Sequence, residues 1–370
     1  MGAVNIIHMA NGDGESSYSK NSRLQETVIR KALPALKHTI SGIAKHDDAI
    51  FDKCFNIADL GCSSGTNTLL SASNIIDMVH EACEENNRTT PQFQVSLVDL
   101  VGNDFNAVFE LLPDFYAKLK KDKGETFGPC FVSAVPGSFY ERLFPDDSLH
   151  LVYSSYSLHW LSRVPEGLEN NTSNIYFSKT SAPNVFQAYQ KQYANDFTNF
   201  LQLRSKELVS GGRMVFTLMG RTLSDVTFDD CCLPWEMLTH SLLDLVKEGL
   251  VRESDITSFN MPYYNPCMDE VKEVVQTEGS FSLESISDFH VNWDPQDADY
   301  TNTNGFTDLS DSHGENSAKM VRAVMEPLLA SHFGSSIIDE LFKNYSKRLT
   351  KHLAIKRTRH VNLVISLTKK

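Results

Sequence analysis

The stretch FNIADLGCSSGTN, residues 55–67, joins an apolar run to a turn of small residues. Its first six residues predict a buried strand, and apolar residues at helical spacing follow from about residue 68 to 84. A strand that passes through a glycine-containing turn into a helix is the first half of a strand–helix–strand unit. The stretch therefore predicts an α/β fold built on a mostly parallel sheet.

The same alternation of strand and helix patterns continues along the chain. Further strand-like runs occupy 93–100, 130–135, 149–155, 213–220, 280–289 and 361–368, and a second long helical pattern covers 188–208. After residue 220 the pattern changes to two helical stretches, 235–248 and 268–278, joined by turns that contain proline. We expect a sheet with helices on both faces, a helical cap over 221–279 and an acidic surface loop at 294–317.

Composition restricts the partners and the compartment. The net charge is −13, which argues against nucleic acid or an anionic membrane as the main partner. Seven cysteines without a C-x-x-C pair suit a reducing compartment. The N-terminus lacks the features of a signal peptide, and no apolar run reaches the ~20 residues of a membrane helix. We expect a cytoplasmic protein whose partner is a small molecule.

The turn at 61–65 has two incompatible interpretations. Gly61 to Gly65 spell G-x-S-x-G, the nucleophile elbow of α/β-hydrolases, with Ser63 as the attacking residue. The same turn, preceded by Asp59, could instead hold a cofactor over the backbone N–H groups at the start of the next helix. Because both sites lie at the carboxyl ends of parallel strands, the fold class does not separate them.

The surrounding sequence favours the cofactor. No glycine-rich segment that could supply an oxyanion hole precedes the turn. Asp59 gives the pattern D-x-G-x-x-x-G, and Asp99 ends the second strand, where a carboxylate suits the hydroxyls of a ribose. The G-x-G-x-x-G spacing of dinucleotide sites is absent, so S-adenosylmethionine fits better than NAD. A serine hydrolase that uses Ser63 stays as the alternative from another class.

Seven blocks in order then resemble the plant SABATH methyltransferases, which methylate salicylate, benzoate, anthranilate, jasmonate or, in some members, xanthines. The blocks are HMANGDGESSYSKNSRLQ (8–25), ADLGCSSGTN (58–67), LVDLVGNDFN (97–106), VPGSFYERLFP (135–145), SSYSLHWLSRVP (154–165), SFNMPYY (258–264) and RAVMEPLLASHFG (322–334). The resemblance implies one catalytic unit over 1–370, with a Rossmann-like methyltransferase core at 31–220 and 280–370. It also implies that residues 1–30 form an N-terminal active-site segment and that the protein is a homodimer.

The resemblance also assigns the cofactor and acceptor sites. The residues that it implies for S-adenosylmethionine are Tyr18, Ser22, Asp59, Cys62, Asn67, Asp99, Leu100, Ser138, Phe139, Ser154 and Ser155. Those that it implies for the acceptor are Gln25, Tyr156, His159, Trp160, Trp235, Tyr264, Val321, Val324 and His360. Gln25 and Trp160 carry the catalytic role, because in this family they hold the carboxylate by hydrogen bonds. A carboxylic acid is already ionised at cytosolic pH, so we expect no general base and interpret His159 as a wall of the pocket.

Two departures from the family pattern bear on the ligands. Thr257 stands where several members have an aspartate associated with Mg²⁺, which puts in doubt an ion held by Asn171, Phe259 and Asn260. His360 replaces the usual aromatic residue at the back of the pocket, which favours a substituted benzoate. We expect a methyltransferase that esterifies a small aromatic acid, or jasmonate, and the alternative within the family is N-methylation of a xanthine.

Overall fold

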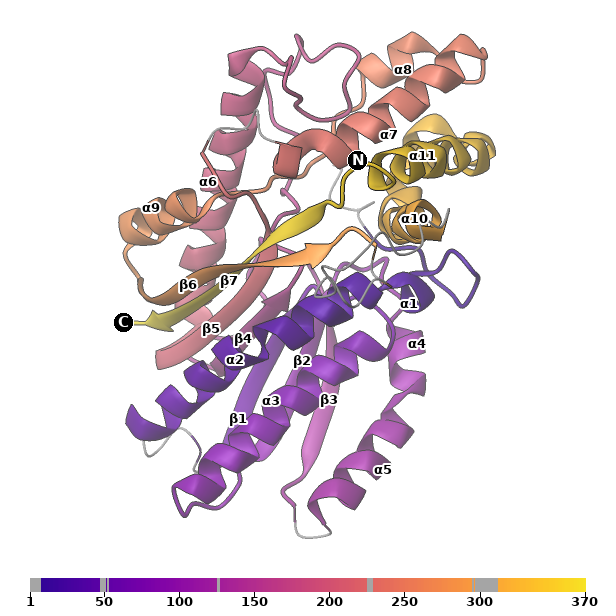
Figure 1. The fold of residues 1–370 in the computed structure, drawn as a ribbon. Helices are drawn as coiled ribbons and strands as arrows, with labels where there is room; N and C mark the ends of the chain where they lie inside the picture. Colours follow the sequence, from indigo (N-terminus) through magenta and orange to yellow (C-terminus); the bar gives the residue numbers. More distant parts are fainter. Residues whose placement is uncertain are drawn as a thin grey trace.

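The computed structural model describes residues 8–46, 51, 53–124, 127–224, 229–294, 296 and 312–370. Its seven-stranded sheet has the order β3-β2-β1-β4-β5-β7-β6 (Figure 1). The strands are β1 (Cys54–Leu60), β2 (Gln92–Asp99), β3 (Cys130–Pro136), β4 (Leu149–Ser155), β5 (Leu208–Gly220), β6 (Phe281–Asn292) and β7 (Arg359–Lys369). Strands β1 to β5 pair in parallel, and β7 is antiparallel to both β5 and β6. The predicted α/β fold with a mostly parallel sheet is confirmed.

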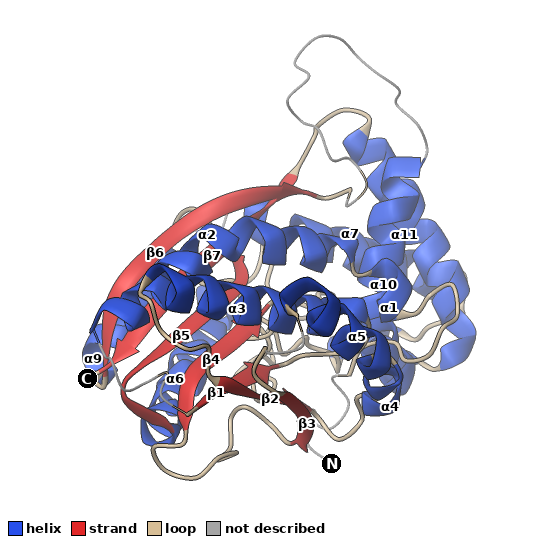
Figure 2. Cartoon of the chain, turned by 90° about the horizontal axis from the view of Figure 1, so that it is seen from below, coloured by secondary structure: helices blue, strands red, loops and turns tan. Residues whose placement is uncertain are grey.

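Helices cover both faces of this sheet and one end of it (Figures 1 and 2). They are α1 (Tyr18–Asn21), α2 (Arg23–His46), α3 (Thr66–Glu85), α4 (Phe105–Glu110), α5 (Leu112–Lys123), α6 (Pro183–Glu207), α7 (Asp229–Lys247), α8 (Glu253–Thr257), α9 (Met268–Glu278), α10 (Ser312–Phe333) and α11 (Ile338–Leu353).

Alternate residues of the strands supply two apolar cores, because successive side chains of a strand point to opposite faces. On β5, Val215 packs in the cluster that contains the apolar residues of α3 and α5, whereas Phe216 lies in the cluster of α6. The Phe216 ring makes an edge contact with Phe197 at 5.7 Å between centroids. Both faces of the strand are therefore buried, which explains the continuous apolar run at 213–220.

The helical layer is larger than the cap predicted over 221–279. It combines helices from that range with α10 and α11, which follow it in the chain. Helix α11 packs against α7 and against α10, while α9 packs against α6 and β6. Of the predicted acidic loop at 294–317, residues 297–311 lie outside the described part of the chain, and 312–317 already belong to α10. Within the described residues, no helix combines the length and apolar character needed to cross a bilayer.

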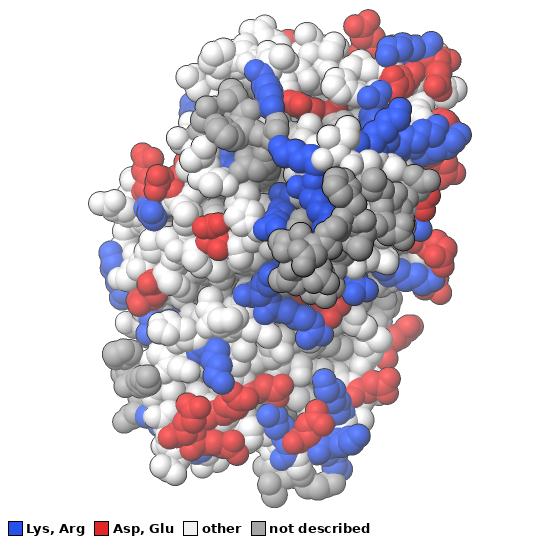
Figure 3. Space-filling view, viewed as in Figure 1, with Lys and Arg blue, Asp and Glu red and all other residues white. Residues whose placement is uncertain are grey.

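In the lower part of Figure 3, groups of Lys and Arg lie beside groups of Asp and Glu. Lys37 of α2 pairs with Glu81 of α3 at 2.9 Å, and Lys123 of α5 pairs with Asp77 of α3 at 2.9 Å. The Lys37–Glu81 pair is about half exposed, and exposed pairs contribute little to stability, so the buried layers hold the fold together.

The strand order reverses between β1 and β4, and the carboxyl ends of these strands border the place where an open α/β sheet binds ligands. The segment before α1 crosses this edge. Its Ala10 N–H donates to the carbonyl of Ala323 in α10 at 2.9 Å, and Asn11 Nδ2 donates to the carbonyl of Gly102 at 3.0 Å. The N-terminal segment thereby connects the helical layer to the loop after β2.

Candidate active site

The turn after β1 is held in a conformation that most side chains disfavour. Gly61 has a φ of +79°, and a Cβ atom there would overlap the Ser157 side chain. Ser63 also lies in the left-handed region, with a φ of +56°. Its N–H donates to Asp99 Oδ2 at 2.6 Å, and its carbonyl accepts from Asn103 Nδ2 at 2.9 Å. The end of β2 therefore determines the shape of the turn.

Asp59 and Asp99 put two buried carboxyl groups beside this turn. Burial, and then the charge of Asp99, raises the pKa of Asp59 to about 8. Burial also raises the pKa of Asp99 to about 6, although backbone N–H groups of Ser63 and Leu100 oppose that shift. Neither carboxyl group forms an ion pair with a Lys or Arg of the described residues. A ligand that brings a positive charge fits this pair, as the sulfonium and ammonium groups of S-adenosylmethionine do.

The interpretation of Ser63 as a nucleophile receives no support from its surroundings. Its Oγ is buried and has no hydrogen-bond partner in the described structure. A serine nucleophile needs a base within hydrogen-bond reach, and here no histidine bonds to it. The role of Ser63 in the fold comes from its backbone, through Asp99 and Asn103.

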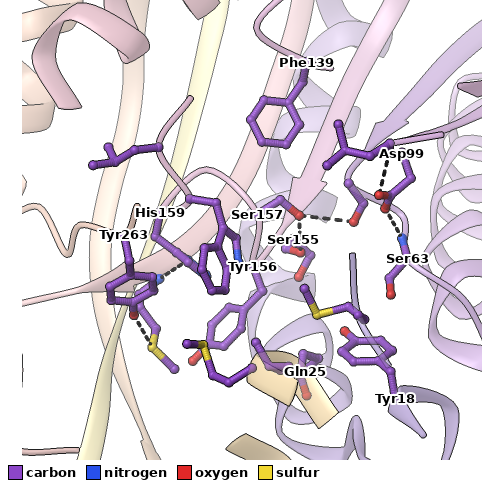
Figure 4. Close-up of a pocket in the computed structure, with 18 of the residues that line it drawn as sticks. Tyr18, Gln25, Ser63, Asp99, Phe139, Ser155, Tyr156, Ser157, His159 and Tyr263 are labelled. Carbon is purple, nitrogen blue, oxygen red and sulfur yellow. Dashed lines mark hydrogen bonds between the residues drawn. The ribbon is translucent and has the colours of Figure 1, made fainter. Parts of the chain in front are cut away.

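A pocket of about 1260 Å³ opens beside the turn. This space includes open solvent at the mouth, and its lining extends from the turn to residues of α7 and α10, so one pocket borders both the turn and the helical layer. In Figure 4, Asp99 and Ser63 lie on one side of the pocket, His159 and Tyr263 lie on the other, and Tyr156 lies between them. The pocket thus has one side near the turn and an opposite side formed by aromatic rings.

Most of the residues predicted for the site line this pocket. They are Tyr18, Gln25, Asp99, Leu100, Ser138, Phe139, Ser155, Tyr156, His159, Trp160, Trp235, Val321, Val324 and His360. Ser22, Asp59, Cys62, Asn67, Ser154 and Tyr264 are buried outside its lining. No sequence pattern singles out several other residues of the lining, among them Met9, Tyr140, Met219, Tyr263, Asn265, Met320 and Met325.

Three of the residues outside the lining support the turn through hydrogen bonds. Asn67 Nδ2 donates to both the carbonyl and the Oγ of Ser22, at 2.9 and 3.0 Å, and joins α3 to the N-terminal helices. Ser154 Oγ donates to the carbonyl of Leu60 at 2.8 Å and joins β4 to β1. These hydrogen bonds hold the turn in position, and none of the three side chains lines the pocket.

The aromatic side of the pocket centres on Tyr263. Its ring contacts His159, Trp160 and Trp235, at centroid distances of 5.1, 5.4 and 5.2 Å. Tyr264, the residue predicted from sequence, faces away and donates from its hydroxyl to Glu270 at 2.8 Å. Residues 160 and 263 form a β-bridge, and in such extended backbone adjacent side chains point in opposite directions. Only one of two consecutive tyrosines can therefore face the pocket.

Gln25 and Trp160 bring neutral hydrogen-bonding groups to this space. Gln25 is buried at the start of α2, and its Oε1 has no partner in the described structure. Trp160 follows β4, and no hydrogen bond to a described residue occupies its indole N–H. No Lys or Arg is among the described residues that line the pocket. An anionic acceptor would therefore be held by neutral donors.

His159 is neutral in this setting. Burial lowers its pKa to about 3. Its Nδ1 accepts the backbone N–H of Met219 at 3.2 Å, so the ring proton lies on Nε2. The residue can donate one hydrogen bond from Nε2, and it has no free nitrogen that could accept a proton near neutral pH.

Tyr156 directly after β4 has a φ of +64°, which is rare for an aromatic residue. Two hydrogen bonds hold it there. Its N–H donates to the carbonyl of Thr217 at 2.9 Å, and its hydroxyl donates to Asn362 Oδ1 at 2.6 Å. Strands β5 and β7 therefore determine where the ring of Tyr156 lies.

A buried ion pair positions the loop that carries Phe139. Arg204 and Glu207 at the end of α6 are both fully buried, and Arg204 Nη2 donates to Glu207 Oε1 at 3.0 Å. Arg204 also donates to the carbonyl of Phe139 at 2.9 Å, while Glu207 accepts the N–H of Leu143 at 2.7 Å. The Arg204–Glu207 pair thus supplies hydrogen-bond partners to backbone groups of the Phe139 loop, which lies outside any helix or strand.

The residues considered for Mg²⁺ do not fit a metal ion. Asn171 Nδ2 donates to Asn260 Oδ1 at 2.7 Å, and Asn171 Oδ1 accepts from Ser181 at 3.1 Å. Both amide oxygens are therefore used, and this group has no carboxylate, the ligand that Mg²⁺ prefers. Elsewhere in the described structure, no three His, Cys, Asp or Glu side chains gather as a metal site.

Comparison with known proteins identifies the family. A model of the SAM-dependent carboxyl methyltransferases matches residues 4–370. The chain is 44% identical over 378 residues to probable jasmonic acid carboxyl methyltransferase 1 of Theobroma cacao, covering all of both chains. It is 44% identical over 369 residues to S-adenosyl-L-methionine:benzoic acid/salicylic acid carboxyl methyltransferase 3 of Petunia hybrida, covering 100% of this chain and 99% of the relative.

A solved structure agrees with this assignment. The structure of loganic acid methyltransferase with SAH matches with a TM-score of 0.84, at 32% identity and 98% coverage of both chains. Since the family model and the relatives span almost the whole sequence, the likeness includes the sheet, the turn and the helical layer. The chain belongs to the S-adenosylmethionine-dependent carboxyl methyltransferases, the family that its resemblance to the SABATH enzymes predicts.

Proposed function

We propose that this enzyme transfers the methyl group of S-adenosylmethionine to the carboxylate of a small aromatic acid. The observation that carries the proposal is the pairing of neutral donors, Gln25 and Trp160, with an aromatic wall in a pocket whose described lining has no Lys or Arg. Neutral donors orient a carboxylate and leave its charge available for attack. The rings of Tyr156, Trp235 and Tyr263 suit a flat acceptor.

The cofactor side of the proposal rests on the turn and on the two carboxyl groups. Asp99, at the end of β2, is placed for the ribose, and Asp59 for the positive charge of the ligand, with Tyr18 and Phe139 as aromatic neighbours. Leu100, Ser138 and Ser155 complete the lining near Asp99. Cys62, Ser22, Asn67 and Ser154 maintain the shape of the turn. When bound, the cofactor supplies a methyl group that is already activated by the sulfonium.

The residues of the protein then have a positioning task. The carboxylate of the acceptor is ionised at neutral pH, so no residue has to remove a proton from it. Gln25 and Trp160 hold one carboxylate oxygen in line with the methyl group, while the aromatic wall restricts the rest of the acid. Correct alignment of two bound reactants lowers a barrier by up to ~7–11 kcal/mol. His159, neutral and a donor only, contributes a wall and one hydrogen bond.

The relatives support the acid class but differ in the acid that they are named for. Their names include jasmonic acid, benzoic and salicylic acid, and loganic acid. The aromatic side of the pocket favours the benzoate type. A cytoplasmic location and a homodimer, both expected from the sequence, belong to this proposal as well.

A methyl-transfer screen tests the proposal. Purified enzyme is incubated with methyl-labelled S-adenosylmethionine and one acceptor at a time: benzoate, salicylate, anthranilate, jasmonate, loganic acid or a xanthine. We expect a methyl ester with at least one aromatic acid and little product from the others. Product from jasmonate or loganic acid alone would overturn the aromatic class, and product from xanthine alone would overturn the roles of Gln25 and Trp160.

A further inference from the structure

Two polar residues in the pocket lining, Asn265 and His360, take no part in holding the carboxylate of the acceptor. Asn265 is buried, with 4% of its surface exposed, and its Oδ1 has no hydrogen-bond partner. His360 is 9% exposed, and no hydrogen bond to a described residue occupies either ring nitrogen. Buried polar groups are nearly always paired, so an unpaired buried amide oxygen calls for an explanation, as does an imidazole in the same cavity that bonds to no described residue.

Both residues lie at the same end of the β5–β7 pair. Gly220 of β5 pairs with Val361 of β7, and His360 precedes Val361. The N–H of Arg221, which follows Gly220, donates to the carbonyl of Pro266 at 3.1 Å, and Asn265 precedes Pro266. Asn265 and His360 thus reach the pocket from neighbouring segments, on a side that also carries Met219 and Trp235.

The backbone on each side holds these side chains in place. The Arg221 guanidinium is buried, donates to the carbonyl of Asn265 and pairs with Glu270 at 2.7 Å. The His360 ring stacks on Trp293 at 5.8 Å between centroids, with 29° between the planes. The Arg221 bond thus holds the backbone of Asn265, and the stacking on Trp293 holds the ring of His360.

Both groups are neutral, which determines what they can bind. Burial lowers the pKa of His360 to about 3, so the imidazole carries no charge at neutral pH. An amide and a neutral imidazole each offer both donor and acceptor atoms. They match a neutral polar group such as a hydroxyl, an amine or a carbonyl, and they offer no charge to a second anion.

We propose that Asn265 and His360 form a polar recognition site for a second hydrogen-bonding group of the acceptor acid. The inference rests on the proposed function and narrows its substrate class to acids that carry a hydroxyl, amino or carbonyl group besides the carboxylate. An acid without such a group would bury the amide and the imidazole unpaired, and would lose the corresponding transition-state stabilisation. A site built to hydrogen-bond a substrate rejects the analogue that lacks the group more strongly than an apolar pocket rejects a methylene.

The test compares kcat/KM for matched acids: benzoate against its hydroxy, amino and acetyl derivatives at each ring position. Wild-type enzyme is measured beside Asn265→Leu and His360→Phe, which keep the side-chain size and remove the hydrogen bonds. The matched control is Asn184→Leu, because Asn184 lies on α6 outside the lining and its Nδ2 donates to Gly167 at 3.3 Å. Calorimetric affinity for SAH checks that each variant is folded.

We expect the wild type to prefer one polar derivative over benzoate by roughly tenfold or more. Each pocket variant should lose most of that preference, because kcat/KM falls much more for the derivative than for benzoate, and Asn184→Leu should behave as wild type. An enzyme that methylates benzoate and every derivative alike overturns this inference alone. Equal losses for both acids in the variants, with SAH binding intact, also overturn it. An enzyme that binds SAH and methylates no acid overturns the proposed function as well.

Discussion

The Asp99 carboxylate accepts the backbone N–H of Ser63 at 2.6 Å and that of Leu100 at 2.8 Å. One side chain at the end of β2 therefore determines the conformation of the turn after β1. The bond to Ser63 holds that residue at a φ of +56°, which costs free energy in the absence of such a partner. The serine of the literal G-x-S-x-G motif thus contributes its backbone to this turn.

Asp99→Ala should weaken SAH binding by roughly 10- to 100-fold, because each hydrogen bond to a charged group contributes ~1.5–3 kcal/mol. Isothermal titration calorimetry measures this change. The matched control is Asp104→Ala, which removes only the N-cap bond from Ala107 to Asp104 on α4. That variant should lose about 1 kcal/mol of stability and keep its SAH affinity. Unchanged SAH affinity in Asp99→Ala would contradict the role of this carboxylate.

Affinity for S-adenosylmethionine should rise between pH 6 and pH 8 and level off above about 8. With a pKa of about 8, Asp59 is mostly protonated in the free enzyme at neutral pH, and a cationic ligand favours the ionised form. Binding must then release protons, which calorimetry in buffers of different ionisation enthalpy detects. Asp59→Asn should flatten the profile. An affinity that is constant over this range in the wild type would refute the coupling.

The raised pKa of Asp59 also affects the free enzyme, whose stability should fall as the pH rises. The folded state keeps the Asp59 proton up to a pKa of about 8, whereas the unfolded chain releases it near ~4. The stabilising effect is fully present below pH ~4 and is lost as the pH rises through about 8. Denaturation at several pH values should show this decline, and it should be smaller in Asp59→Asn.

Trp160→Phe and Gln25→Ala should each lower kcat/KM by roughly 10- to 100-fold, since each removes one hydrogen bond to a charged carboxylate, worth ~1.5–3 kcal/mol. Affinity for SAH should change much less. Gln25→Glu is the sharper test, because it keeps the side-chain length and places a negative charge beside the carboxylate of the acceptor. Its kcat/KM should fall further than that of Gln25→Ala. If both Gln25 variants retain full activity, the residue does not hold the acid.

The turnover number should show no ionisation between pH 5.5 and pH 8 that belongs to His159. Its pKa of about 3 and the N–H bond from Met219 keep the imidazole neutral throughout this range. His159→Asn, which preserves an acceptor near the Nδ1 position, should keep a flat profile at a lower rate. A rate that falls below pH ~6.5 in the wild type but not in the variant would identify His159 as a base instead.

Arg204→Leu should lower the free energy of unfolding by ~3 kcal/mol, because the buried Glu207 would keep only Arg142, 3.4 Å away and partly exposed, as a charged partner. Chemical denaturation measures the change. Lys37→Met is the control, since it breaks a pair that is about half exposed on the surface and should have little effect. If Arg204→Leu is as stable as the control, the ion pair does not hold the loop at Phe139.

The sequence by itself determined the class of fold and the family, and it predicted the turn after β1 as the cofactor site. These properties depend on local patterns: apolar runs that are buried on both faces, glycine and small residues at a sharp turn, and an acidic residue at a strand end. The same patterns assigned no helix to the segments that form α2, α10 and α11.

Only the tertiary structure decided which side chains meet in the pocket. In the structure Tyr263 faces the pocket, whereas its neighbour Tyr264 faces away. Ser154 forms a hydrogen bond between β4 and β1 instead of lining the pocket. Asn265 and His360 lie on neighbouring segments at one end of the β5–β7 pair. Adjacent residues of similar chemistry are alike in a sequence pattern, whereas the direction of each side chain depends on strand pairing and on hydrogen bonds from distant segments. The turn can therefore be recognised from thirteen residues, but the acceptor site requires the packing of the whole sheet and its helical layer.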